Sequence, residues 1–458
     1  MKDIALRALP VLATILAGVA LLLWIGPDLV SATQAATEIE PGPVPVPGAT
    51  SRVGDGALGL EPLEPWIAAD PADPSRILVA AMTTGTNGLS SVIYTSPDRG
   101  ASWHRATLAD GTQLFPGGDP AATFGLDGAA FFTTLHNGMT VWRSDDAGRN
   151  WLDGVQVPGG SYDRQWIDVD RSGGPDRGRV YSAGKVWITV LERIARDVMA
   201  VSYSDDRGAS FRSPRLILPP PNEQILHVAT DLIVDKNGDV LVSYLTFLLR
   251  DEADRPDDGS LAGRYWLIRL TDDGRTHEGL FEIAPRRSYG HASPALSNMG
   301  LGGGGLELDP TTGRMYLVWP EAVRDRIQIY AAASADGGRT WAEPQRVNSG
   351  GFDANLSNPA IAASDGVVAV TWNDRRADPE GICFQLYGAV SVDGGSTFGP
   401  GVPLTTGRAC MSGRWANGGD TQGLVGLGDG RFLATALHDT AQGRELWAVE
   451  FGATDGVE

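Results

Sequence analysis

The stretch SADGGRTW (334–341) recurs, slightly altered, at five other places in this 458-residue chain. Four close copies are SPDRGASW (96–103), SDDAGRNW (144–151), SDDRGASF (204–211) and SVDGGSTF (391–398). All five share a template of Ser, any residue, Asp, any residue, Gly, any residue, a small polar residue and an aromatic. A sixth copy, LTDDGRTH (270–277), lacks the serine and the aromatic. Such spaced recurrence indicates a repeat architecture.

The template predicts a tight turn between two strands. An Asp side chain accepts hydrogen bonds from the backbone N–H groups that follow it, and Gly two positions later takes a positive φ without steric cost. The closing aromatic then packs inward, and the template supplies no nucleophile. We therefore expect a structural role for Asp98, Gly100, Trp103, Asp146, Gly148, Trp151, Asp206, Gly208, Phe211, Asp272, Gly274, Asp336, Gly338, Trp341, Asp393, Gly395 and Phe398.

Each string follows two short apolar stretches joined by a Gly- or Asp-containing turn, as in GLELDPTTGRMYLVW (305–319). This pattern is typical of a β-hairpin. A seventh such hairpin, GLVGLGDGRFLATALHD (423–439), has no string of its own and is followed by one more strand, RELWAVEF (444–451). The sequence thus predicts seven repeats. We expect residues 53–61 to add the missing outer strand beside 444–451 and so close the ring.

The repeated strings resemble the Asp-box, or BNR, repeats of the sialidase superfamily. The resemblance implies an all-β, seven-bladed β-propeller, with each box between the third and fourth strands of a blade and away from the central funnel. Non-enzymatic seven-bladed members, such as photosystem assembly and stability factors, are the nearest in kind. A fold shared by enzymes and non-enzymes does not by itself decide activity.

An uncharged stretch of about twenty residues, 8–27, follows Lys2 and Arg7 and is long enough to span a bilayer as a helix. We expect residues 1–30 to be a single transmembrane anchor, 31–52 a Pro- and Gly-rich linker, and 53–458 the propeller. The positive charges place the propeller on the periplasmic side of the cell inner membrane. A cleaved signal peptide is the alternative, with small residues in VSA (30–32).

The composition argues against several classes of function. A net charge of −19 gives no basic footprint for nucleic acid. Six scattered histidines and the absence of a phosphate-loop motif predict no metal site and no cofactor. Calcium in the acidic loop DEADRPDD (251–258) is left open. Cys383 and Cys410 form a disulfide or are two separate buried thiols.

The resemblance also implies a ligand funnel lined by residues near the starts of the innermost strands. Two interpretations stay open: a wet channel that needs polar lining, or a pair of carboxylates for glycosidic acid/base chemistry. The candidate lining residues are Glu64, Asp119, Asp163, Arg164, His227, Asp231, His291, Asn358, Asp420 and Gln422.

Sialidases carry an arginine in an (F/Y)RIP motif near the start of their catalytic domain. No RIP occurs in this sequence, and FRSP (211–214) belongs to a box. We therefore expect a non-catalytic propeller that acts as a scaffold or accessory subunit of a membrane protein complex, with a photosynthetic complex suggested by the resemblance. Its partners would be integral membrane proteins that contact the anchor helix and the propeller face. The alternative is a sialidase-like exo-glycosidase that acts on extracellular glycans.

Overall fold

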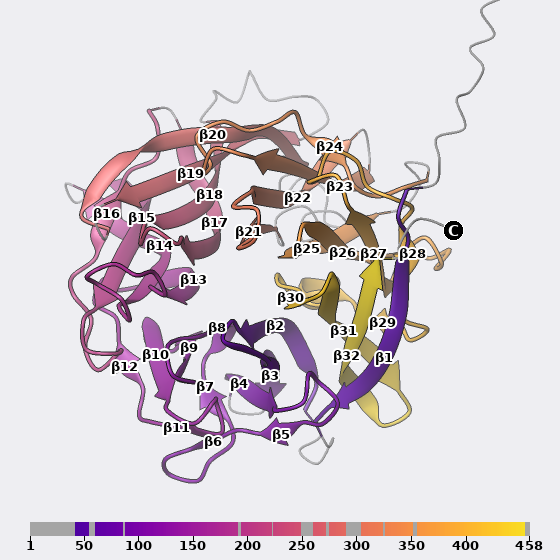
Figure 1. Cartoon of the computed structure of the whole chain (residues 1–458), viewed down its shortest axis with the longest axis horizontal. Coiled ribbons are helices and arrows are strands. Elements are labelled where there is room, and N and C mark those ends of the chain that lie inside the picture. Colours follow the sequence, from indigo (N-terminus) through magenta and orange to yellow (C-terminus); the bar gives the residue numbers. More distant parts are fainter. Residues whose placement is uncertain are drawn as a thin grey trace, which may run out of the picture. The chain divides into compact units, whose positions relative to one another are not determined.

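The computed structural model describes residues 42–54, 60–85, 88–190, 194–221, 223–248, 260–271, 274–289, 304–323, 326–350 and 355–453. These residues form strands and turns, apart from a 3₁₀ helix at Gly413–Trp415. The strands build seven sheets around a central axis, as Figure 1 shows. The predicted all-β, seven-bladed propeller is confirmed. In the described part of the chain no helix is long and apolar enough to cross a membrane, and the predicted anchor lies outside that part.

Blades 1 to 3 are antiparallel sheets whose strands run outward from the axis in chain order. Blade 1 contains β2 (Pro62–Asp70), β3 (Asp73–Gly85), β4 (Gly88–Ser96) and β5 (His104–Arg105), with β7 (Phe115–Pro116) also on β4. Blade 2 contains β8 (Gly118–Phe124), β9 (Ala130–Leu135), β10 (Met139–Ser144) and β12 (Val155–Gln156). Blade 3 contains β13 (Tyr162–Val169), β14 (Val180–Val190), β15 (Ile194–Ser204) and β16 (Arg215–Ile217). A short parallel pair, β6 (Thr107–Leu108) with β11 (Asn150–Trp151), links blades 1 and 2.

Blades 4 to 6 repeat this arrangement. Blade 4 contains β17 (Glu223–Val234), β18 (Val240–Leu248), β19 (Ser260–Thr271) and β20 (Thr276–Tyr289). Blade 5 contains β21 (Gly305–Leu308), β22 (Met315–Val323), β23 (Arg326–Ser334) and β24 (Gln345–Arg346). Blade 6 contains β25 (Leu356–Ser364), β26 (Val367–Asp374), β27 (Cys383–Ser391) and β28 (Val402–Pro403), with β29 (Ala409–Cys410) also on β27.

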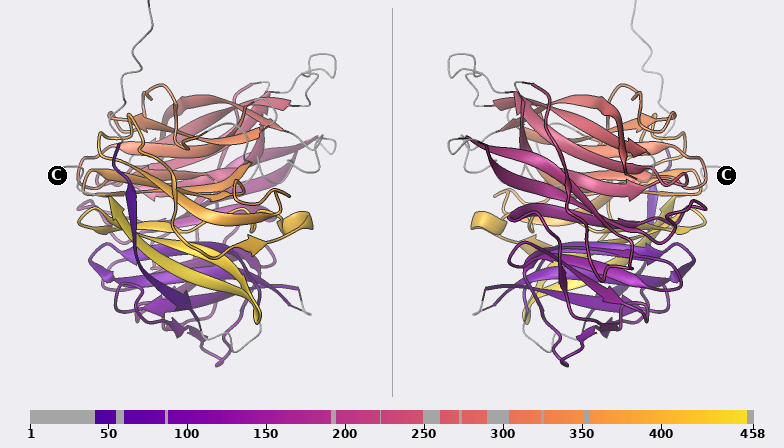
Figure 2. Two further views of the ribbon diagram at one scale, coloured as in Figure 1. Left: turned by 90° about the vertical axis from the view of Figure 1, so that its right-hand side faces the viewer. Right: turned by 90° about the vertical axis from the view of Figure 1, so that its left-hand side faces the viewer.

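Blade 7 joins the two ends of the described chain. Its inner strands are β30 (Leu424–Gly428), β31 (Arg431–Thr440) and β32 (Gly443–Ala453), and its outermost strand is β1 (Pro45–Val53). The register pairs Pro45 with Ala453 and Val53 with Leu446. Figure 2 shows indigo β1 lying along yellow β32.

The prediction that residues 53–61 close the ring was therefore wrong: the closing strand begins at Pro45, inside the segment expected to be a linker. Its prolines, which suggested a linker, are acceptable because β1 is an edge strand and Pro has no N–H to donate to a further neighbour. Residues 55–59 and 31–41 lie outside the described part.

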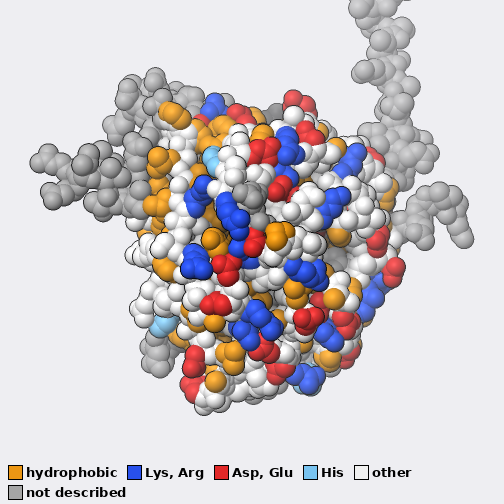
Figure 3. Space-filling view, turned by 60° about the vertical axis from the view of Figure 1, so that its left-hand side comes forward, with side chains coloured by type: hydrophobic (Ala, Val, Ile, Leu, Met, Phe, Trp, Pro, Cys, Tyr) orange, Lys and Arg blue, Asp and Glu red, His pale blue; other side chains and the backbone are white. Residues whose placement is uncertain are grey.

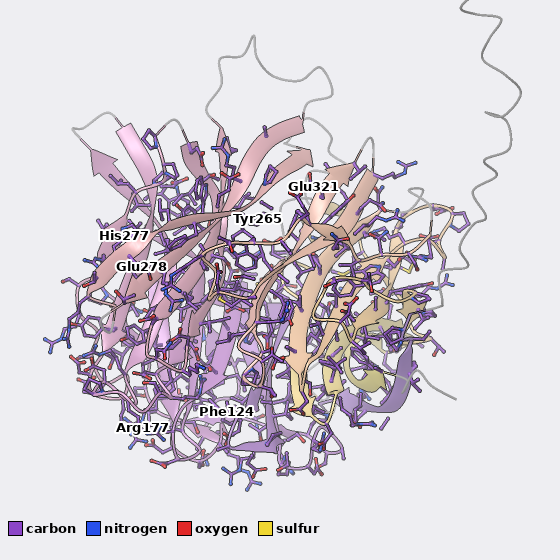
Figure 4. All side chains as sticks on the ribbon, turned by 45° about the horizontal axis from the view of Figure 1, so that its top comes forward. Phe124, Arg177, Tyr265, His277, Glu278 and Glu321 are labelled. Atoms are coloured by element: carbon purple, nitrogen blue, oxygen red, sulfur yellow. A yellow bond between two sulfur atoms is a disulfide. The ribbon has the colours of Figure 1, made fainter. Side chains whose placement is uncertain are left out.

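The alternation of strands gives the ring two faces. The entry face carries the starts of the innermost strands and the turns between second and third strands. The turn face carries the turns between first and second strands and the repeated strings. Contacts such as Arg99 N to Ser75 O (2.8 Å) and Ala147 N to Gly128 O (3.0 Å) join these two kinds of turn. In Figure 4, Phe124 and Arg177 mark the turn face at the bottom, and Glu321 lies toward the entry face.

The hydrophobic core lies between neighbouring blades. In β3 the residues Ile77 to Met82 are all buried, because blades cover both faces of this strand. One inter-blade cluster combines Leu78 and Ile93 of blade 1 with Phe132 of blade 2 and Trp151. Such packing makes the blades a rigid frame for the residues that line the central channel.

Candidate functional site

The five complete strings form one repeated turn. In the first, Asp98 Oδ1 accepts from Ser102 N (2.8 Å) and Ser96 Oγ (2.8 Å), while Gly100 N donates to Ser96 Oγ (2.8 Å). Corresponding bonds recur around Asp146, Asp206, Asp336 and Asp393. The turn glycines have φ between 82° and 87°, where a side chain would be strained. At least three hydrogen bonds to each carboxylate leave it committed to its turn.

The aromatic residues of the strings differ in their partners. Trp151 Nε1 donates to Gly148 O (2.7 Å), and Trp341 Nε1 donates to Gly338 O (3.0 Å). Trp103 Nε1 instead donates to Ser51 Oγ (2.9 Å), which ties the first string to the closing strand β1. Phe211 and Phe398 pack against the core clusters. In the sixth string Gly274 has φ 76°, and Asp272 lies outside the described residues.

At the entry face, four innermost strands begin with the same irregularity. Glu64, Asp119, Arg164 and Asn358 have φ between 49° and 54°, and each lies at a register shift in its strand pairing. A β-bulge of this kind redirects a side chain. A positive φ is uncommon for a residue other than Gly. The sequence signal is a polar residue before Pro or Gln at the strand start: EPW, DPA, DRQ and NPA.

Glu64, Arg164 and Asp420 meet at the entry end of the channel. Asp420 N donates to Glu64 Oε1 (3.0 Å), and Glu64 N donates to Gly418 O (2.9 Å). Arg164 Nη2 lies 2.7 Å from Asp420 Oδ2. Arg164 comes from blade 3 and Asp420 from the connection into blade 7, so this ion pair joins blades that are not neighbours in the ring.

The crossing segment, residues 416–420, is held by blade 6 as well. Asn358 Nδ2 donates to Gly419 O (2.8 Å) and Asn417 O (3.1 Å), and Asn417 Nδ2 donates back to Asn358 Oδ1 (3.1 Å). Arg375 Nη2 donates to Ala416 O (2.9 Å), and burial lowers the pKa of Arg375 to about 10. The side chains of Arg375 and Asn417 complete this network, although their positions in the sequence did not predict it.

A disulfide between Cys383 and Cys410 lies near the base of this connection, which settles the alternative of two separate thiols. It joins β27 to β29, whose residues Phe384 and Ala409 also pair. The crossing segment therefore starts from a covalently fixed point.

The remaining predicted lining residues lie apart from this network. Asp163 pairs with Lys185 Nζ (2.8 Å), and Lys185 lies 4.8 Å from the ring of the half-exposed Trp187. The main-chain oxygen of Asp119 accepts from Gln165, and Gln422 Nε2 donates to Thr435 Oγ1 (3.1 Å). His227 belongs to β17, but its side chain is outside the described part, as is all of His291.

Asp231 lies in β17, two residues before Ile233, which lines a cavity that opens on the turn face. We call it the turn-mouth cavity; its volume is 930 Å³. Turns between first and second strands of six blades contribute to its wall. Representative wall residues, one per blade, are Pro71, Ser172, Asn237, Pro310, Ser364 and Val425.

Two carboxyl groups from innermost strands line this cavity, Asp168 and Glu307, and both interact electrostatically with Asp231. Asp168 accepts from Arg171 Nη2 (2.7 Å) and from Val234 N (2.9 Å). Burial raises the pKa of Glu307 to about 8, and the carboxylates of Asp309 and Asp168 add to the effect. Burial also raises the pKa of Asp231 well above its usual value, with Glu307 and Asp168 contributing. Shifted carboxyl groups in a concave site indicate a place where chemistry or binding occurs.

Other charged residues near the cavity are used by the fold. Asp70, Asp235 and Asp309 each accept the N–H of a residue in their own turn. Arg269 is surrounded by Asp235 (3.1 Å), Asp239 and Glu278 (3.0 Å); Glu278 is labelled in Figure 4. No group of three or more His, Cys, Asp or Glu in the described residues could hold a metal ion.

No protein-family model matches this sequence, and a search of curated proteins finds no match. Solved structures with a similar fold include a protein of unknown function from Dyadobacter fermentans, with 14% identity over 89% of this chain and 99% of that one, at a TM-score of 0.43. A polysaccharide lyase of the ulvan lyase type has 12% identity over 84% and 93%, at 0.49. Trypanosoma rangeli sialidase has 10% identity over 90% of this chain and 57% of its own, at 0.42. At these identities the likeness concerns the fold alone.

Proposed function

We propose that this chain is a non-catalytic propeller, anchored in the cell inner membrane by residues 1–30, that braces or recruits integral membrane proteins from the periplasmic side. It would act as an accessory subunit of a membrane protein complex, and a photosynthetic complex is one candidate. The single observation that supports this proposal most is the network at the entry end of the channel, where the ionisable side chains bond to one another.

Acid/base catalysis needs a carboxyl group that can approach a substrate and exchange a proton with it. At the entry end Glu64 receives Asp420 N, Asp420 pairs with Arg164, and Asp163 pairs with Lys185. Glu64 is buried, and a substrate that used the more exposed carboxylates of Asp420 and Asp163 would have to break their ion pairs first. The network therefore favours a structural role for the residues that the resemblance placed in a ligand funnel.

The covalent attachment of the amino-terminal segment favours the turn face as the partner-binding face. The chain enters there, and a Cβ on Gly399 would collide with the carbonyl oxygen of Pro43, so entering chain and blade 6 are in close contact. On the side of the molecule shown in Figure 3, acidic and basic side chains alternate instead of forming one patch. Mixed charge of this kind suits a specific protein contact better than general attraction to a charged polymer.

An exo-glycosidase is the second candidate, and one observation favours it. Asp168 and Glu307 bring two carboxyl groups to the turn-mouth cavity, and glycosidases use a pair of them. This site would lie at the opposite end of the channel from the residues that the family resemblance suggested.

Cell fractionation and an activity assay test the proposal together. We expect the full chain to stay in the membrane fraction after washing with alkaline carbonate, and a chain lacking residues 8–27 to become soluble. We also expect no hydrolysis of aryl α-sialoside or aryl arabinofuranoside substrates. A soluble mature chain beginning near Thr33, together with hydrolysis that is lost in Glu307→Gln, would replace the scaffold with the glycosidase.

A further inference from the structure

The turn-mouth cavity has the form of a small-molecule site. Its 930 Å³ lies in the range of cavities that enclose organic ligands, which bury most of their surface in a largely apolar wall. Apolar side chains from five blades line it: Ile233, Leu241, Leu308, Met315, Ala363 and Val425 are among them, with Pro71 and Pro74. Burying an alkyl chain there would remove apolar surface from water on both partners.

We propose that the turn-mouth cavity binds a small organic cation, a primary ammonium group on an alkyl body, with the ammonium placed on the carboxyl group of Glu307. This inference concerns a ligand site that does not depend on the proposed scaffold role.

The charge of the cavity wall favours a cationic ligand over an anionic one. Seven acidic and four basic side chains line the cavity. Three of the basic ones are already paired: Arg171 with Asp168, Arg269 with Asp235, and Arg339 with Glu278 (2.8 Å). The fourth, Lys236, is exposed on the β17–β18 turn. An anion would meet excess negative charge here, whereas a cation would be attracted.

Glu307 is the acidic group that remains available. The aspartates of the wall accept hydrogen bonds within their own turns or, for Asp168 and Asp365, from other segments, but Glu307 Oε1 accepts a single long bond, from Ala363 N (3.4 Å). In the described residues no Lys or Arg forms an ion pair with it. A half-buried carboxylate without a cation loses part of its hydration, and an ammonium group supplies both the opposite charge and N–H donors.

Ser364 adds a second polar group that has no partner. It lines the cavity next to Ala363, its exposed fraction is 4%, and its Oγ has no hydrogen-bond partner in the described part of the chain. Buried polar atoms are rarely left unbonded, so an unbonded hydroxyl in a cavity wall indicates that a ligand or solvent partner belongs there. An ammonium has three donors, enough for Glu307 and Ser364 Oγ together.

The wall also argues against a sugar as the ligand. None of the lining residues is aromatic, so a pyranose ring has no flat surface on which to stack. The protonation of Glu307 agrees with a cation: burial and the neighbouring carboxylates of Asp309 and Asp168 raise its pKa to about 8, and a bound cation reverses this effect. The ligand would therefore displace a proton when it binds below pH 8.

The test compares n-pentylamine with 1-pentanol by titration calorimetry, using the full chain in lipid nanodiscs and subtracting empty nanodiscs. At pH 8.5 we expect the amine to bind one to one and at least tenfold more tightly than the alcohol. Glu307→Gln should lower amine affinity at least tenfold, to that of the alcohol. Ser364→Ala should lower it by about two- to fivefold.

The control is Glu343→Gln, the same change at an exposed residue outside the cavity wall, which should leave amine affinity unchanged. Because the amine stays charged and Glu307 must ionise, wild-type affinity should fall several-fold from pH 8.5 to pH 6.5, and Glu307→Gln should lose this dependence. Equal binding of amine and alcohol, undiminished amine binding to a folded Glu307→Gln variant, or no binding of the amine would each overturn the inference.

Discussion

The two ends of the central channel carry similar residue types but treat them differently. At the entry end, Asp420 of the crossing segment bonds to both Glu64 and Arg164. At the turn end, Glu307 lines a cavity and forms no ion pair with a Lys or Arg of the described residues. The difference follows from loop length. Pro71 and Ala72 alone separate β2 from β3, so such turns cannot reach the axis, whereas residues 404–423 between β28 and β30 can. Connections, more than strands, decide which end of this channel is filled.

The largest expected effect comes from removing the disulfide from which the crossing segment starts. Replacing both Cys383 and Cys410 by Ser removes a cross-link over 27 residues, which the chain-entropy model values at about 3–4 kcal/mol. Urea unfolding should show this loss, and pentylamine binding at the other end should not change. Unaltered stability of the double variant would mean that the crossing segment does not need its covalent base.

Asn358 should be the most costly single side chain at the entry end. Asn358→Ala removes three buried hydrogen bonds to the crossing segment, at about 2–3 kcal/mol. Asn137→Ala is the matched control, because Asn137 has a similar φ of 54° but is exposed. Equal losses in urea unfolding would assign the effect to backbone strain instead of the network.

Glu307→Gln should raise stability at high pH. The folded-state pKa of Glu307 is about 8, above the ordinary value of 4.5, so only the unfolded chain ionises between these values. The free energy of unfolding of the wild type then falls as pH rises from about 4.5 to 8. Because water in the cavity reduces the cost of the charge, we expect a fall on the order of 2 kcal/mol. The variant should lack this fall in melts recorded at pH 5 and pH 8.5. A variant no more stable than wild type at pH 8.5 would remove the contrast between the two ends.

Asp336 provides the smallest and sharpest comparison, because it lines the same cavity as Glu307. Burial acts to raise the pKa of Asp336, but hydrogen bonds from Thr340, Ser334 and Arg339 outweigh it and lower the pKa to about 2. The stability that the Asp336 carboxylate contributes is therefore present above pH 3.8 and is lost as pH falls toward 2. Asp336→Ala should lower stability at pH 7 by about 1 kcal/mol, since the group is exposed. Its amine affinity, measured by the same calorimetry, should equal that of wild type.

The sequence predicted the repeat number because each blade has a local signal, a hairpin, which in blades 1 to 6 is followed by a turn template. It did not predict the crossing segment, since Glu64 and Asp420 meet across 356 residues of chain. Prolines concealed β1, because composition does not distinguish a linker from an edge strand. Glu307 and Asp168 had a weak signal: each is an acidic residue inside an apolar inner strand, in GLELD and WIDVD. Arg171 pairs with Asp168 and not with Glu307. This difference depends on how the side chains pack in the folded protein, so the sequence did not predict it.

The closing strand β1 also gives the molecule a mechanical property. It pairs with β32 at both of its ends, and the chain that precedes it leaves from the turn face at Pro45. A pull on the preceding chain along the strand loads the hydrogen bonds of this ladder together, in shear, instead of opening them one after another. Trp103 and Gly100 of blade 1 hold Ser51 on this strand, so part of the load passes into the next blade. Tension on the chain that precedes β1 would thus be spread over the seam of the ring.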